Sequence, residues 1–225
     1  MSTTVNYELA EKVLRSVLAF PEEHNQDSWF DVTNFGTIPE DDSSHYVDDG
    51  GNILESRHIT LDAMTEGGCG TSACIAGWAA LHDGWTVKVK QVFRDSGVDD
   101  FMFDVYNPQG LLDQDEVAGP DFEDAGAEAL GLSGYAAHTL FYTMGETEAI
   151  ISLYSLVTKG GIHELSLFDV AEEFGIKVSL SDDFDDGYEE AQREVIKALR
   201  QKYPLSPTAP ASEPVTKEEP TLLSL

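Results

Sequence analysis

The first long apolar pattern lies near the start of the chain and has the spacing of a helix. Asn6 can cap the first turn with its side-chain oxygen, and Pro21 cannot continue the helix. The pattern therefore predicts an amphipathic helix over 6–19. Its apolar positions are Leu9, Val13, Leu14, Val17 and Leu18.

Similar patterns fill the C-terminal half of the chain. Gly160 and Gly161 follow one of them, as expected just after a helix C-terminus. The sequence therefore predicts a series of C-terminal helices. Their predicted ranges are 122–130, 135–142, 146–159, 166–174 and 187–203.

Alternating apolar and polar residues mark the middle of the chain. They predict a half-buried strand over 85–93 and a partner strand over 101–106, after a short extended segment over 53–61. The segments 31–52 and 95–120 are acidic and rich in turn residues, and we interpret them as insertions. Together these patterns indicate an α+β fold that is mainly helical, with a small antiparallel β element.

Residues 67–82 bring together glycines, both cysteines and many small apolar side chains. The glycines before Thr71 predict a loop whose backbone is free to take positive φ. Thr71 or Ser72 can cap the helix that follows, which we expect over 72–82. Because this helix carries mostly Ala and Gly, its neighbours can approach closely. We therefore expect a central, buried helix.

The length and composition fit one domain with an appended tail. The chain has 225 residues and a mass of 24.6 kDa, and we place a single globular domain at 1–203. Residues 204–225 are rich in Pro, Ser, Thr and Glu and predict a disordered tail. No apolar run has the length of a membrane helix, and the N-terminus lacks a signal-peptide pattern. These features predict a cytoplasmic protein without a membrane partner.

Charge is the strongest compositional feature. The chain has 42 acidic and 13 basic residues, which gives a formal net charge of −29. Direct nucleic-acid binding is disfavoured, because affinity for phosphate comes from clustered Lys and Arg. Three interpretations remain: general solubility, imitation of the phosphate array of DNA, and adaptation to a high-salt cytoplasm. Binding carboxylates are predicted in the first acidic segment, at Asp41, Asp42, Asp48 and Asp49.

The cysteines suggest a second kind of chemistry. Cys74 is predicted in the first turn of the central helix, where the helix dipole favours a thiolate. With Cys69, the stretch superficially resembles the nucleophile region of papain-type proteases. It departs from them because 61–68 contains no oxyanion-hole glutamine and His138 lies in a helical pattern. A thiol enzyme would use His82 or His138 as its base. The alternative is that both thiols are small buried side chains.

The same stretch does not predict a metal site. Cys69, Cys74 and His82 offer three ligands, whereas structural zinc takes four with closer cysteine spacing. Cys74 and His82 would also lie roughly 12 Å apart along the helix. Without signs of secretion we expect reduced thiols and no disulfide. We predict neither a metal nor a cofactor.

Three separated pieces of the chain resemble an uncharacterised family of small proteins from actinobacteria and their phages. Residues 21–29 resemble its HPExxxQxxW piece, with Phe20 in place of the histidine. Residues 69–79 resemble its CGTxACIAGWA signature, and residues 129–141 resemble its LLGLxxxxAxxLF helical pair. The resemblance covers roughly residues 6–142. It implies a phage or bacterial cytoplasmic setting and no particular reaction.

Two functions follow as hypotheses. The first is an acidic phage-type accessory protein that binds a host protein of basic charge, with nucleic-acid mimicry as one mechanism. It rests on the net charge, the resemblance and the lack of a complete catalytic set. The second is a thiol-dependent hydrolase or transferase that uses Cys69 or Cys74 of the CGTSAC motif. Geometry discriminates between them, because a nucleophile and its base must lie within about 4 Å.

Overall fold

The computed structural model describes residues 4–21, 23–26, 30–32, 46–47, 53–65, 71–94, 97–106, 122–142, 145–178 and 184–205. Several predicted features lie outside the described residues: Cys69, Asp41, Asp42, Asp48, Asp49 and most of the predicted tail, at 206–225.

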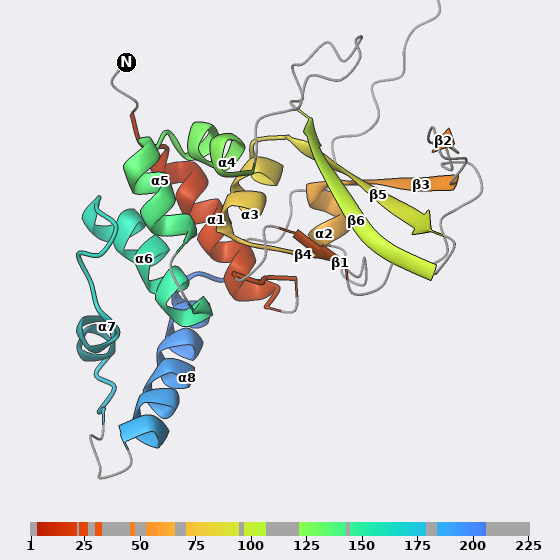
Figure 1. The fold of residues 1–225 in the computed structure, drawn as a ribbon. Helices are drawn as coiled ribbons and strands as arrows, with labels where there is room; N and C mark the ends of the chain where they lie inside the picture. The colour runs from red at the N-terminus through yellow and green to blue at the C-terminus, as the bar shows by residue number, and fades with distance from the viewer. Residues whose placement is uncertain are drawn as a thin grey trace, which may run out of the picture.

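The described part of the chain is mainly helical, as the sequence predicted. Figure 1 shows α1 in the middle of a group of helices, and it contacts α3, α4, α6 and α8. The predicted ranges 122–130 and 146–159 coincide with the bounds of two helices, and the other C-terminal predictions differ by a few residues. The helices are α1 (Tyr7–Ala19), α2 (Leu61–Thr65), α3 (Ile75–His82), α4 (Phe122–Leu130), α5 (Gly134–Phe141), α6 (Glu146–Lys159), α7 (Leu167–Glu173) and α8 (Phe184–Lys202).

Helix α1 forms where the apolar spacing placed it. The Asn6 side-chain oxygen accepts a hydrogen bond from the backbone N–H of Leu9 at 3.1 Å, which satisfies one of the donors left open in the first turn. The helix ends at Ala19, two residues before Pro21. All five predicted stripe residues are buried, so this face of α1 packs into the core of the helical group.

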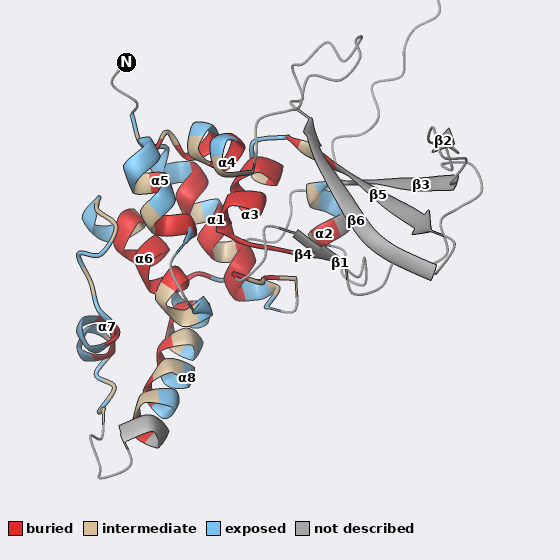
Figure 2. Ribbon diagram, in the orientation of Figure 1, coloured by how far each residue is buried: buried red, intermediate tan, exposed pale blue. Residues whose placement is uncertain are grey.

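Helix α3 is buried from Ile75 to Leu81, and Figure 2 shows it as a continuous buried segment. Its small side chains let α4 come close. A Cβ built at Gly126 of α4 would lie 2.8 Å from the Cα of Ala76. Trp78 fills the remaining space, with its ring stacked on Phe20 at 6.1 Å between centroids. The prediction of a central, buried small-residue helix is confirmed.

The strands lie to one side of the helical group (Figure 1). A short pair joins β1 (Phe30–Val32) to β4 (Thr71–Ala73), and the larger sheet has the order β2-β3-β5-β6 with antiparallel pairing throughout. Part of the segment predicted to be irregular is therefore a strand, because β6 extends from 97 and pairs with β5 across a register shift after Val92. The strands of the larger sheet are β2 (Tyr46–Val47), β3 (Ile53–Ile59), β5 (Thr86–Arg94) and β6 (Gly97–Tyr106).

The last helices return to α1. Helix α6 ends at Gly160, which takes the left-handed conformation with a φ of 80°. Helix α8 then runs back along the group, and Arg200 Nε donates to the carbonyl of Leu18 at 2.8 Å. Lys202 Nζ donates to Tyr154 OH at 2.7 Å and lies 2.9 Å from Glu173 Oε1. These contacts join the C-terminal helices to the N-terminal one.

Candidate functional site

Cys74 lies at the junction of β4 and α3. Its backbone is extended, with φ −73° and ψ 177°, and it occupies the N-cap position without a side-chain capping bond. The prediction that the helix begins at residue 72 and places Cys74 in its first turn is therefore wrong. The reason is non-local: residues 71–73 pair with β1, which holds the backbone extended up to the cysteine.

The thiol of Cys74 is closed off from solvent. The residue is 1% exposed, and burial raises the pKa of the thiol to about 11, although backbone N–H groups of Gly77, Ala76 and Cys74 act in the opposite direction. Desolvation of the charged form thus outweighs the helix N-terminus, which agrees with the interpretation of Cys74 as a small buried side chain and not with an activated thiolate. At neutral pH Cys74 is a protonated thiol with no access to a substrate.

The segment before β1 packs against the same junction. Ala73 donates its N–H to the carbonyl of Glu23 at 2.8 Å and accepts from the N–H of Asn25 at 3.2 Å. The buried ring of His24 places Nδ1 3.1 Å from the carbonyl of Ala73. A carbonyl can only accept, so Nδ1 carries the proton and Nε2 is the bare acceptor. Nε2 has no hydrogen-bond partner among the described residues.

His24 is therefore held as a neutral imidazole. Burial lowers its pKa to about 4, and the hydrogen bond to Ala73 opposes that shift without cancelling it. No pattern in the sequence singles out this histidine. Its only signal was its place inside the 21–29 motif, between residues that resemble the family piece.

Gln26 connects three elements with one amide group. Its Nε2 donates to the carbonyl of Phe141 at 2.8 Å and lies 3.5 Å from that of Leu140, both at the C-terminus of α5. Its Oε1 accepts from the N–H of Ile75, the first residue of α3, at 3.3 Å. The side chain is buried. It supplies one acceptor and two donor contacts to helix ends that need them.

His82 is paired with a serine and not with a thiol. Its Nε2 lies 2.7 Å from Oγ of Ser16 on α1. Burial, followed by the positive charge of Lys12, lowers the pKa of His82 to about 4. A Ser–His pair can be a nucleophile and its base, but Ser16 is 1% exposed inside a helix. We interpret the contact as a link between α1 and α3. A pocket of about 510 Å³ lies beside it, lined by Lys12 and Arg15 among others.

The thiol hypothesis needs a base that contacts Cys74, but Cys74 is buried, whereas His138 is exposed and His82 is bonded to Ser16. Cys74 and His82 stand at opposite ends of α3, about 12 Å apart by helical rise. His138 lies on α5, where its Nδ1 is 3.7 Å from Glu123 Oε1 and its ring packs on Tyr142 at 4.3 Å between centroids. Cys74 and these two histidines therefore do not form one site.

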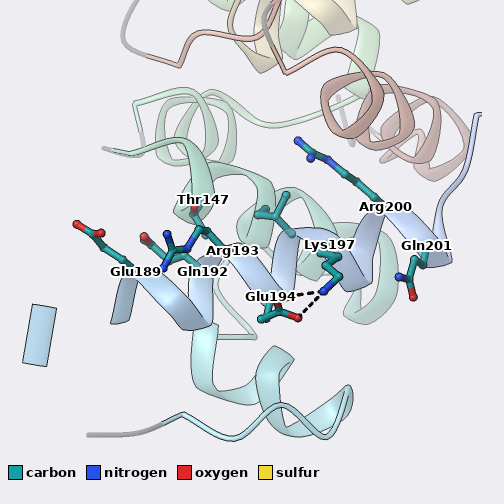
Figure 3. Close-up of a pocket in the computed structure, with 9 residues that line it drawn as sticks. Thr147, Glu189, Gln192, Arg193, Glu194, Lys197, Arg200 and Gln201 are labelled. Carbon is teal, nitrogen blue, oxygen red and sulfur yellow. Dashed lines mark hydrogen bonds and ion pairs between the residues drawn. The ribbon is translucent and has the colours of Figure 1, made fainter. Parts of the chain in front are cut away.

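A pocket with a volume of about 820 Å³ follows α8 (Figure 3). Two of its basic side chains have partners within the protein: Lys197 Nζ pairs with Glu194 at 3.0 Å, and Arg200 Nε donates to the carbonyl of Leu18. Arg193 and Thr147 complete one end of it. The pocket is open and lined by charges of both signs, and it contains none of the candidates that the sequence predicted.

Within the described residues, no group of three or more His, Cys, Asp or Glu side chains is placed to hold a metal ion. None of the described helices combines the length and the apolar composition that crossing a membrane requires. No protein-family model, no curated protein and no solved structure matches the chain.

Proposed function

We propose that this protein is an acidic accessory protein of phage type that binds a basic host protein in the bacterial cytoplasm. The observation that carries the proposal is the formal net charge of −29 on a chain of this length. A surface of this kind attracts a cationic partner over distances limited by salt screening, about 8 Å at physiological ionic strength. The resemblance of three motifs to proteins of actinobacteria and their phages supports the setting.

The mechanism that we propose is imitation of nucleic acid. Proteins that bind DNA do so largely through Lys and Arg contacts to regularly spaced phosphates. Carboxylates on an acidic protein can occupy the same basic surface and exclude the DNA. The predicted carboxylates at Asp41, Asp42, Asp48 and Asp49 belong to the acidic segment 31–52, and we propose that this segment contributes to the contact.

The proposal also assigns the fold to the α+β class with a small antiparallel β element. Two strands of the larger sheet lie within the acidic segments in the sequence: β2 falls inside 31–52, and β6 falls inside 95–120. Segments that connect strands commonly carry functional residues, and we propose that these two segments do so here.

A thiol-dependent hydrolase or transferase is the alternative, and no described feature favours it. Cys74 is buried with a raised pKa, and His82 is bonded to Ser16. The binding proposal needs neither group. It predicts that the thiols can be replaced without loss of function, whereas the enzyme hypothesis predicts that they cannot.

The test is an affinity capture from lysate of the bacterial host, followed by elution with increasing salt and by competition with duplex DNA. We expect a basic DNA-binding protein that elutes at moderate salt and that duplex DNA displaces. Replacement of Asp41, Asp42, Asp48 and Asp49 by Asn or Ser should slow association more than it speeds dissociation.

The control is the matched replacement of Cys69 or Cys74 by Ser, which should leave capture intact. Capture that resists salt and competing DNA, or that disappears in the cysteine variants while the aspartate variant still binds, would show that the acidic-binder proposal is wrong.

A further inference from the structure

Helix α5 has a buried face and an exposed aromatic face. Ala137, Leu140 and Phe141 are buried against the rest of the helical group. Tyr135 is 85% exposed and Tyr142 is 51% exposed. At about 100° per residue, Tyr135, His138 and Tyr142 fall within an arc of about 60° on the opposite side of the helix. The helix therefore presents an aromatic stripe to solvent.

The stripe is ordered by a carboxylate from the neighbouring helix α4. Tyr142 OH donates to Glu123 Oε2 at 3.3 Å, and His138 Nδ1 lies 3.7 Å from Glu123 Oε1. The rings of His138 and Tyr142 pack on each other at an interplanar angle of 39°. We call Tyr135, His138, Tyr142 and Glu123 the α5 tyrosine surface. Three of its groups are fixed relative to one another before any partner arrives.

The surroundings of this surface are acidic. Residues 122–142 contain Glu123, Asp124 and Glu128 and no Lys or Arg. Asp124 and Glu128 are exposed on α4, which packs beside α5 (Figure 1). An ionised carboxylate has about four acceptor positions, so Glu123 keeps acceptor capacity beyond its contacts to Tyr142 and His138. A docking partner must therefore bring positive charge.

We propose that the α5 tyrosine surface docks an arginine-bearing basic segment of a partner protein; this inference rests on the proposed function and identifies its contact site. A guanidinium group can stack on an exposed tyrosine ring and at the same time pair with a carboxylate through two N–H groups. A lysine ammonium lacks the planar face and the fork of donors. Tyrosine is also enriched in interfaces, because its large ring has few rotatable bonds to order.

Other occupants fit this surface less well. A second copy of the chain would bring a partner that also carries a net charge of −29, which opposes association through this acidic face. Nucleic acid is excluded by the same repulsion. An uncharged apolar segment could cover the rings but would bring no N–H groups to pair with the Glu123 carboxylate beside them.

The experiment uses two amidated peptides of equal length and charge, one alternating Arg and Ala and the other alternating Lys and Ala. Binding to the full-length protein is followed at low salt by backbone amide chemical shifts, which locate the contact, and by calorimetry. We expect the Arg peptide to bind about 2- to 5-fold more tightly than the Lys peptide, from the usual strength of exposed cation–π contacts. The shifts should concentrate in 122–142.

Substitutions then test the rings directly. Tyr135→Ala should weaken binding of the Arg peptide by about 2- to 5-fold and remove its advantage over the Lys peptide. Tyr135→Phe should keep both the affinity for the Arg peptide and its advantage over the Lys peptide, because the ring face is retained. The matched control is Phe168→Ala on α7, since Phe168 is an aromatic residue that is 42% exposed on another helix. It should leave binding unchanged, and circular dichroism should show that all three variants are folded.

Two results would overturn different parts of the reasoning. Equal affinity for both peptides, with no effect of Tyr135→Ala and with shifts spread outside 122–142, would show that the α5 tyrosine surface is not the contact, while the acidic-binder proposal would stand. Failure of both peptides to bind at low salt would contradict the acidic-binder proposal itself.

Discussion

Replacing the Gln26 amide by an apolar group of similar volume should destabilise the protein strongly. In Gln26→Met, Ile75 N–H loses the acceptor at 3.3 Å and the carbonyl of Phe141 loses the donor at 2.8 Å. A buried donor left without its partner costs about 1–3 kcal/mol, and loss of one further hydrogen bond costs about 0.5–1.5 kcal/mol. We therefore expect a total loss of about 2–4 kcal/mol.

The assay is urea unfolding followed by circular dichroism, with thermal unfolding in parallel. For a chain of this size the expected loss corresponds to a decrease in Tm of about 5–15 °C. Gln201→Met is the matched control, because Gln201 is exposed on α8, and it should change stability by less than about 0.5 kcal/mol. A Gln26→Met protein as stable as this control would refute the view that the amide links α3 and α5.

Three further predictions concern the core. Cys74 should resist iodoacetamide in the native protein and react after unfolding; rapid native alkylation would contradict its raised pKa and burial. Gly126→Ala should cost about 1–3 kcal/mol despite a better helix propensity, because its Cβ has no room. The control Gly134→Ala, where nothing lies within 4 Å, should be neutral. Both His24 and His82 have folded pKa values of about 4, below the usual 6.5. Their contribution to stability is therefore present above pH 6.5 and lost as the pH falls towards 4, by up to about 3 kcal/mol each. Urea midpoints of His24→Gln and His82→Gln should depend less on pH over this range, and an unchanged pH dependence would contradict the lowered pKa values.

The helices were predictable because their signals are local. The apolar stripe of α1, its Asn6 cap and the Gly160 stop of α6 are each contained within a few neighbouring residues. That another helix approaches α3 closely was predictable, because the small side chains of Ala and Gly leave room for a neighbouring backbone. Its partner, Gly126, could not be named, because nothing in the sequence says which helix packs on which.

The site was less predictable because its determinants are long-range. Cys74 follows a Gly-Thr-Ser sequence that is typical of a helix start, and only the pairing of 71–73 with β1 keeps it extended. The helix dipole argument for a thiolate ignored desolvation, which dominates for a fully buried thiol. The spacing of Tyr135, His138 and Tyr142 fits either a buried or an exposed stripe. The stripe is exposed because the other face of α5 carries the buried side chains, Ala137, Leu140 and Phe141.

Gln26 gives a physical reason why the three motif pieces occur together. It belongs to the 21–29 piece, its acceptor binds Ile75 of the 69–79 piece, and its donor binds Phe141 of the 129–141 piece. The same junction holds Cys74 closed and keeps His24 neutral. Packing and hydrogen bonding at this buried junction are enough to constrain the residue types that meet there, and no catalytic role is needed to explain them. Function is therefore to be sought on the surface that this junction leaves free, such as the exposed face of α5.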